Sequence, residues 1–80
     1  MKIQVTQEDI DKGQPIDCFK CPVALATSRI LGQETQVRSD FIIFDSVWYD
    51  MPIEVCNFIK KFDNAENARP LEFDINLKGE

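Results

Sequence analysis

Hydrophobic and polar residues alternate near both ends of the chain, with the two-residue period that is typical of a half-buried β-strand. Near the start, Ile3 and Val5 alternate with Lys2 and Gln4. Near the end, over residues 71–77, a hydrophobic set alternates with a polar set: Leu71, Phe73, Ile75 and Leu77 against Glu72, Asp74 and Asn76. The pattern predicts one strand in each segment, with one face of each strand on the core.

Two longer segments have hydrophobic residues at helical spacing, with residues that start or stop helices at their ends. Pro22 and Gly32 bound the first, whose hydrophobic face comprises Val23, Ala26, Ile30 and Leu31. Pro52 opens the second, whose stripe at i, i+3, i+4 and i+7 comprises Val55, Phe58, Ile59 and Phe62. A short helical turn over residues 7–11 is also predicted, because Thr6 is a good N-cap and Gly13 a stop signal.

Residues 34–50, between the two longer helices, are rich in β-branched and aromatic residues, which favour strands. Turn residues occur at Ser39-Asp40 and at Asp45-Ser46, so we expect two or three short antiparallel strands here. The run Phe41-Ile42-Ile43-Phe44 is hydrophobic throughout, which predicts a central strand that is covered on both faces.

These elements predict an α+β fold: a small, mostly antiparallel sheet of three to five strands with two helices packed on one face. The connections are too short for a doubly wound parallel fold, in which each crossover takes roughly a dozen residues or more. A chain of 80 residues has room for one small domain, so we assign residues 1–80 to a single domain.

Charge and composition argue against several classes of function. Fourteen Asp and Glu residues against nine Lys and Arg give a formal net charge of −5, which disfavours direct contact with nucleic acid or with an anionic membrane surface. The chain has no histidine, so Ser-His, Cys-His and His-metal chemistry cannot be assembled within one chain. There is no Gly-rich phosphate loop and no pair of acids at catalytic spacing. We therefore expect neither enzymatic activity nor a cofactor.

Cys18, Cys21 and Cys56 allow three interpretations. Cys18 and Cys21 stand near a helix N-terminus, the setting of a redox pair, but a polar loop separates them from the preceding strand and Asp17 would raise a thiol pKa. A zinc site needs about four ligands, so these three cysteines would need Asp17 or a second chain as the fourth. We favour structural thiols. An odd number of cysteines in so small a chain also indicates the reducing cytoplasm.

Trp48 and Tyr49 are adjacent, so in a strand their side chains point to opposite faces. We expect one of them to lie in the core and the other to be partly exposed, where it can anchor a partner. In the last strand, Glu72 and Asp74 face outward at what we expect to be a sheet edge, and with the exposed aromatic residue they form the predicted partner-binding surface. The alternatives are that both aromatic residues pack under a helix edge and that the acids form an ordinary solvated face.

Five segments resemble other proteins: 5–13 (VTQEDIDKG), 17–26 (DCFKCPVALA), 51–55 (MPIEV), 58–63 (FIKKFD) and 70–73 (PLEF). In this order they resemble a family of small uncharacterised proteins that is common in phage and bacterial genomes. The resemblance covers most of the chain. It implies a small accessory protein encoded by a phage, and it carries over no activity and no site residues.

The function that we expect is that of a small acidic binding protein that modulates or inhibits a host protein in the host cytoplasm, for example a defence or nucleic-acid-processing factor with a basic cleft. One alternative is an oligomer that sequesters a small nucleotide-type signal, with Trp48 or Tyr49 for stacking and these arginines as phosphate contacts: Arg29, Arg38 or Arg69. The redox or zinc module above is a further alternative. Because so small a domain buries a modest core, we also expect self-association into a homo-oligomer to add stability.

Overall fold

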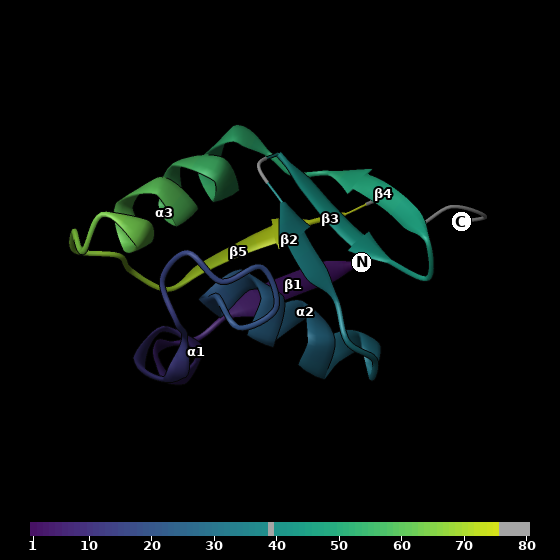
Figure 1. Ribbon diagram of the computed structural model, residues 1–80, viewed down its shortest axis with the longest axis horizontal. Coiled ribbons are helices and arrows are strands. Elements are labelled where there is room, and N and C mark those ends of the chain that lie inside the picture. The colour runs from purple at the N-terminus through teal and green to yellow at the C-terminus, as the bar shows by residue number, and fades with distance from the viewer. Residues whose placement is uncertain (39, 76–80) are drawn as a thin grey trace.

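The structure is a computed structural model that describes residues 1–38 and 40–75, and it confirms the α+β class (Figure 1). Within these residues the elements are β1 (Lys2–Val5), α1 (Gln7–Lys12), α2 (Pro22–Leu31), β2 (Gln36–Arg38), β3 (Phe41–Phe44), β4 (Val47–Asp50), α3 (Ile53–Asp63) and β5 (Leu71–Asp74). Every predicted helix and strand is therefore present. None of the helices in the described residues has the length and hydrophobicity that a membrane crossing requires.

The ends of α1 and α2 lie at the residues that the sequence singled out. Thr6 caps α1, because its hydroxyl accepts a hydrogen bond from the backbone N–H of Asp9 at 3.2 Å. The carboxylate of Asp9 in turn accepts one from the backbone N–H of Thr6 at 2.9 Å, which completes a capping box. Pro22 is the first residue of α2. Gly32 ends this helix with a φ of 72°, a conformation that glycine adopts without strain.

Asp9 also ties α1 to α2 and to β1. Its buried carboxylate forms an ion pair with the guanidinium of Arg29, which donates a second hydrogen bond to the carbonyl oxygen of Gln4 at 3.1 Å. Burial by itself raises the pKa of Asp9, but the hydrogen bonds from Arg29 and Thr6 outweigh it and hold that pKa below its usual range. The side chain of Arg29 is therefore committed to the fold.

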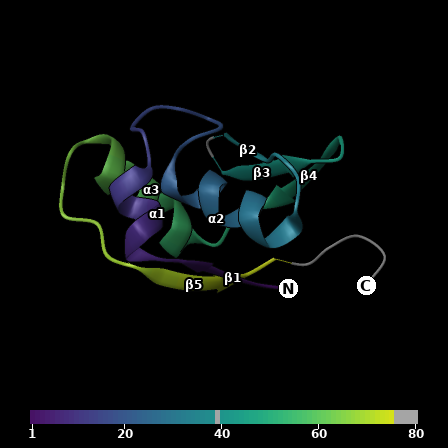
Figure 2. The same cartoon turned by 90° about the horizontal axis from the view of Figure 1, so that it is seen from below.

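The strands are divided between two sheets, where the sequence pattern predicted one. β1 pairs antiparallel with β5, and a separate antiparallel sheet has the strand order β2-β3-β4. Figure 2 shows the two sheets on opposite sides of the molecule, with α2 between them. Alternation of residues indicates which face of a strand is buried, but it does not indicate which strands are neighbours. The division into two sheets is therefore a property of the tertiary structure alone.

A tight turn determines the register of the three-stranded sheet. Asp45 and Ser46 join β3 to β4 with φ values of 55° and 62°, the left-handed conformation of a type I′ hairpin turn. This turn pairs Phe44 with Val47, and the remaining pairs of β3 and β4 follow from it. β3 is the central strand, as predicted.

Coverage of β3 differs between its two faces, whereas the uniformly hydrophobic run predicted that both would be covered. Ile42 and Phe44 are buried in the core. Phe41 and Ile43, on the opposite face, are only half-buried. The reason is that the helices pack on one side of this sheet only, as Figure 2 shows.

Half of the predicted core residues of the two longer helices are buried: Val23 and Ala26 on α2, and Val55 and Phe58 on α3. Leu31 and Ile59 are half-buried and pack against the core, and Phe62 is half-buried and stacks on Phe58. Ile30 departs from the prediction, because its side chain is exposed. It lies in the last turn of α2, which reaches the periphery of the molecule (Figure 1).

Buried hydroxyl groups join α2 to the segment that leads into β2. Thr27 and Thr35 are almost fully buried, and their Oγ1 atoms are 2.5 Å apart. Each hydroxyl also lies within hydrogen-bonding distance of a carbonyl oxygen of α2, Thr27 of that of Val23 at 2.9 Å and Thr35 of that of Ala24 at 3.2 Å, and one of the two threonines donates to the other. Ser28 continues this hydroxyl chain: its Oγ lies 3.1 Å from Thr35 Oγ1 and accepts the backbone N–H of Thr35 at 3.0 Å. The chain holds the start of the three-stranded sheet against α2.

The alternation predicted for the last strand is confirmed as far as Ile75. Phe73 and Ile75 are buried and Leu71 is half-buried, whereas Glu72 and Asp74 are exposed. Asn76 and Leu77, the rest of the predicted segment, lie outside the described residues, and so does Ser39 of the predicted turn at 39–40.

Candidate functional site

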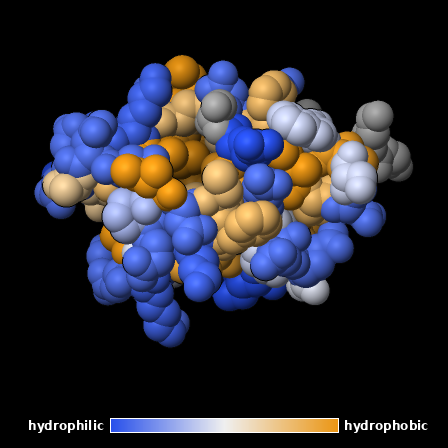
Figure 3. All heavy atoms as spheres, viewed as in Figure 1, coloured by the Kyte–Doolittle hydropathy of each residue, from blue (hydrophilic) through white to orange (hydrophobic). Residues whose placement is uncertain are grey.

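One face of the three-stranded sheet points away from the helices and carries hydrophobic side chains between charged ones. Its members follow from the register, in which Gln36, Ile43 and Trp48 form one cross-strand row. Residues two apart on a strand share a face, so the row formed by Arg38, Phe41 and Asp50 belongs to this face as well. We call these residues the outer face: Gln36, Arg38, Phe41, Ile43, Trp48 and Asp50. Figure 3 shows the molecule from this side, where hydrophobic and hydrophilic surface are intermixed.

Trp48 and Tyr49 lie on opposite faces of β4, which confirms that one of the two is in the core and the other exposed. Tyr49 is 9% exposed and stacks on Phe44, with ring centroids 4.7 Å apart. Trp48 is 56% exposed. Its ring and that of Phe41 form a T-shaped pair with a centroid distance of 5.3 Å and an interplanar angle of 71°, a favourable geometry for two aromatic rings. Trp48 and Phe41 thus form an aromatic pair that solvent reaches.

Glu72 and Asp74 point outward from β5, as predicted, but a basic neighbour partly offsets their charge. Lys2 lies opposite Asp74 in the register, and its ammonium group is 3.6 Å from the carboxylate of Glu72. Gln4 donates a second bond to Glu72 at 3.2 Å. The charge of Glu72 is therefore already engaged within its own sheet.

A hollow of about 450 Å³ brings three of the four predicted binding residues together. Trp48, Tyr49 and Asp74 line it, while Glu72 does not. Its other lining residues are Asp50, Met51, Pro52 and Ile75. Among the described residues that line the hollow there is thus no basic side chain to balance Asp50 and Asp74. Asp50 was not predicted as a site residue, although the two-residue turn at 45–46 places it opposite Phe41.

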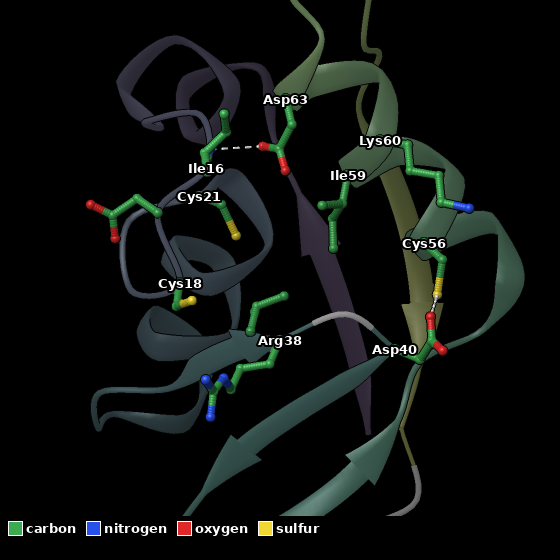
Figure 4. Close-up of a pocket in the computed structure, with 11 residues that line it drawn as sticks. Ile16, Cys18, Cys21, Arg38, Asp40, Cys56, Ile59, Lys60 and Asp63 are labelled. Carbon is green, nitrogen blue, oxygen red and sulfur yellow. Dashed lines mark hydrogen bonds between the residues drawn. The ribbon is translucent and has the colours of Figure 1, made fainter.

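All three cysteines line a second pocket, of about 460 Å³, between the 13–21 loop, β2 and α3 (Figure 4). Cys21 caps α2, since its Sγ accepts the backbone N–H of Ala24 at 3.4 Å. Cys56 donates to a carboxylate oxygen of Asp40 at 3.5 Å, on the side of the pocket away from Cys18 and Cys21. The three thiols share a pocket without converging on one point.

The surroundings of these thiols favour packing over nucleophilic chemistry. Burial raises the pKa of the Cys21 thiol to about 11, and burial and the adjacent Asp40 raise that of Cys56. A reactive cysteine has the opposite property, a lowered pKa that populates the thiolate. In the part of the chain that the structure describes, no three His, Cys, Asp or Glu side chains form a group that could hold a metal ion.

The arginines of the nucleotide-binding alternative lie in three separate places. Arg29 is bound to Asp9 and to the backbone of β1. Arg38 lies on the outer face and also lines the cysteine pocket. Arg69 lines a groove beside Lys61, between α3 and the segment before β5. The structure therefore does not bring these three guanidinium groups together.

Comparisons with protein-family models, with curated proteins and with solved structures give no match to this chain. Its geometry is therefore the basis for any functional assignment.

Proposed function

We propose that this chain is a small non-enzymatic binding protein that contacts a host protein through the outer face and modulates or inhibits it. The exposure of Trp48 carries the proposal. This residue is 56% exposed and lies beside the half-buried Phe41. A partner that covered both rings would gain free energy from removing hydrophobic surface from water. Tryptophan is also one of the residues most enriched at interface hot spots.

The charges around Trp48 favour a partner with a basic contact region. Asp50 and Asp74 line the hollow beside the ring. A lysine or arginine side chain that entered this hollow would meet two carboxylates and an aromatic ring, all of which attract a cation. The net charge of −5 would add attraction to a basic surface at longer range. The resemblance to small phage proteins agrees with a target in the cytoplasm of a host cell.

The test is capture of a partner from a bacterial lysate by the immobilised chain, with identification by mass spectrometry. Trp48→Ala should lower the affinity for the captured protein by about 30-fold or more, as expected for a hot-spot residue. Ile16→Ala is the matched control, because Ile16 is 83% exposed but lies in the 13–21 loop, outside the outer face and the hollow. Capture that survives Trp48→Ala unchanged, or is lost equally in both variants, contradicts the proposal.

Two charge reversals on β5 test the acidic part of the surface. Asp74→Lys should slow association and weaken the salt dependence of binding, because Asp74 lines the hollow. Glu72→Lys makes the same change in charge two residues away, outside the hollow and beside Lys2, and should have the smaller effect. Equal effects would show that the hollow is not part of the contact. A native mass that reveals a bound nucleotide or zinc would instead favour one of the two alternative functions.

A further inference from the structure

The strand register determines how charged and hydrophobic residues are distributed over the outer face. Arg38 on β2, Phe41 on β3 and Asp50 on β4 lie directly opposite one another in a single row. Neighbouring strands are about 4.8 Å apart, so this row carries opposite charges at similar distances on either side of Phe41. In the next row, Ile43 lies in the same way between Gln36 and Trp48. The face is thus hydrophobic along its midline and oppositely charged at its two flanks.

We propose that two copies of this chain pack face to face through the outer face, related by a two-fold axis parallel to β3. Such an axis exchanges the two flanks, so Arg38 of each copy lies against Asp50 of the other and two ion pairs form. Phe41 and Ile43, on the midline, meet their own equivalents, and Trp48 covers Gln36. A symmetric dimer requires a surface that is complementary to itself in this manner.

The charges select this axis over the other two-fold axis in the plane of the interface. An axis perpendicular to the strands keeps each flank on its own side, so both Arg38 residues lie at one flank and both Asp50 residues at the other, and like charges share each flank. The axis parallel to β3 also leaves the strands of the two sheets aligned, as in β-sandwiches, with the sheets about 10 Å apart. One arrangement therefore suits both the hydrophobic and the charged residues.

The contact is small, so the dimer is weak. Three strands at a spacing of about 4.8 Å, with about 3.3 Å per residue along each, make a patch roughly 10–15 Å on a side. Its area is thus roughly 100–225 Å², well below the roughly 800 Å² that each partner buries in a stable interface. We expect a dissociation constant in the micromolar range or above, and rapid exchange with the monomer. If the function proposed above holds, the dimer also conceals Trp48 until a target supplies a cation that replaces Arg38 beside Asp50.

Fluorescence of the wild-type chain is the first measurement. Trp48 is the only tryptophan in the chain, so its emission reports on the outer face directly. As the concentration rises from about 1 μM to about 1 mM, the emission maximum should move to shorter wavelength, and sedimentation equilibrium should show conversion of monomer to dimer. A chain that stays monomeric with unchanged emission over this range overturns the proposal, and no variant is needed to find this out.

Charge reversal is the second measurement. Arg38→Asp places acids against Asp50 at both flanks and should raise the dissociation constant of the dimer about tenfold or more, as should Asp50→Arg. The double variant restores opposite charges and should return the constant to within about threefold of wild type. Lys61→Asp makes the same change in net charge as Arg38→Asp, on the exposed side of α3, and should leave the dimer unchanged. A dimer that tolerates Arg38→Asp, or that the double variant fails to restore, overturns the proposal.

This proposal and the proposed function can fail separately. Capture of a target without any self-association refutes the dimer and leaves the function standing. Self-association of a chain that captures no target refutes the function and leaves the dimer standing.

Discussion

Replacing Thr35 by valine should destabilise the fold, because Thr35 is the middle member of the hydroxyl chain that joins α2 to the three-stranded sheet. Valine has nearly the same volume but puts a methyl group where the hydroxyl stands. That hydroxyl lies 2.5 Å from Thr27 Oγ1, whereas a methyl carbon stays about 3.3 Å or more from an oxygen. The substitution therefore requires a displacement of about 0.8 Å at a position that is 1% exposed.

The expected cost has two parts. Loss of the hydrogen bonds that the Thr35 hydroxyl makes with Thr27 and Ser28 costs about 1–2 kcal/mol in net free energy of unfolding. Strain from the overpacked methyl group adds about 1–3 kcal/mol. The total, about 2–5 kcal/mol, is a large part of the roughly 4–12 kcal/mol that a domain of 80 residues has.

Urea unfolding followed by circular dichroism measures this cost, and Thr35→Ser is the control. Serine keeps the hydroxyl and loses only a methyl group, so it should cost about 1 kcal/mol. The slope of the unfolding free energy with urea should be the same for all three proteins, since the same surface is exposed on unfolding. If valine costs no more than serine, the hydroxyl chain does not hold the sheet to α2 and the reasoning is refuted.

Three further predictions concern α3, Asp9 and the thiols. Phe58→Ala should cost roughly 3–5 kcal/mol in urea unfolding and Lys60→Ala under about 0.5 kcal/mol, because one side chain is buried and the other exposed; small, equal effects would contradict the packing of α3. Since the folded-state pKa of Asp9 is lowered, its contribution to stability is present above the unfolded value of about 3.9 and disappears as the pH falls through the folded value. Asp9→Asn should therefore destabilise the fold at pH 7 and flatten the fall in stability below about pH 4, and parallel stability curves for the two proteins would argue against it. With a thiol reagent at about pH 8, the half-buried Cys18 should react before the buried Cys21, whose pKa is about 11; equal rates would show that Cys21 is accessible.

The helices and strands were predictable because the residues that start, end and pattern them lie within a few positions of one another in the sequence. Thr6 and Asp9 cap each other three residues apart, and Gly32 supplies the left-handed residue that ends α2. Ile30 is a residue for which the local sequence pattern gave the wrong burial. Helical spacing placed it on the hydrophobic face, but only the tertiary structure shows that this face ends before the last turn of α2.

The surface was less predictable, because it depends on contacts between distant parts of the chain. Asp74 lies beside Trp48 only because β5 ends near the three-stranded sheet, and no local pattern contains that placement. The outer face itself was within reach of the sequence. A two-residue turn at Asp45-Ser46 implies the pairing of Ile43 with Trp48 and so the members of this face, whereas the hydrophobic run of β3 wrongly predicted that both of its faces would be covered.

β1 and β5 pair although they are far apart in the sequence, and this separation determines which of the two sheets forms first during folding. Val5 pairs with Leu71, so a loop of roughly 65 residues must close before β1 has a neighbour, at an entropic cost of about 4 kcal/mol. The three-stranded sheet consists of consecutive hairpins and closes over a few residues at a time. We therefore expect it to form early and the two-stranded sheet to form last. Until β5 has been synthesised, β1 remains an unpaired edge, and a nascent chain at that stage is most exposed to aggregation.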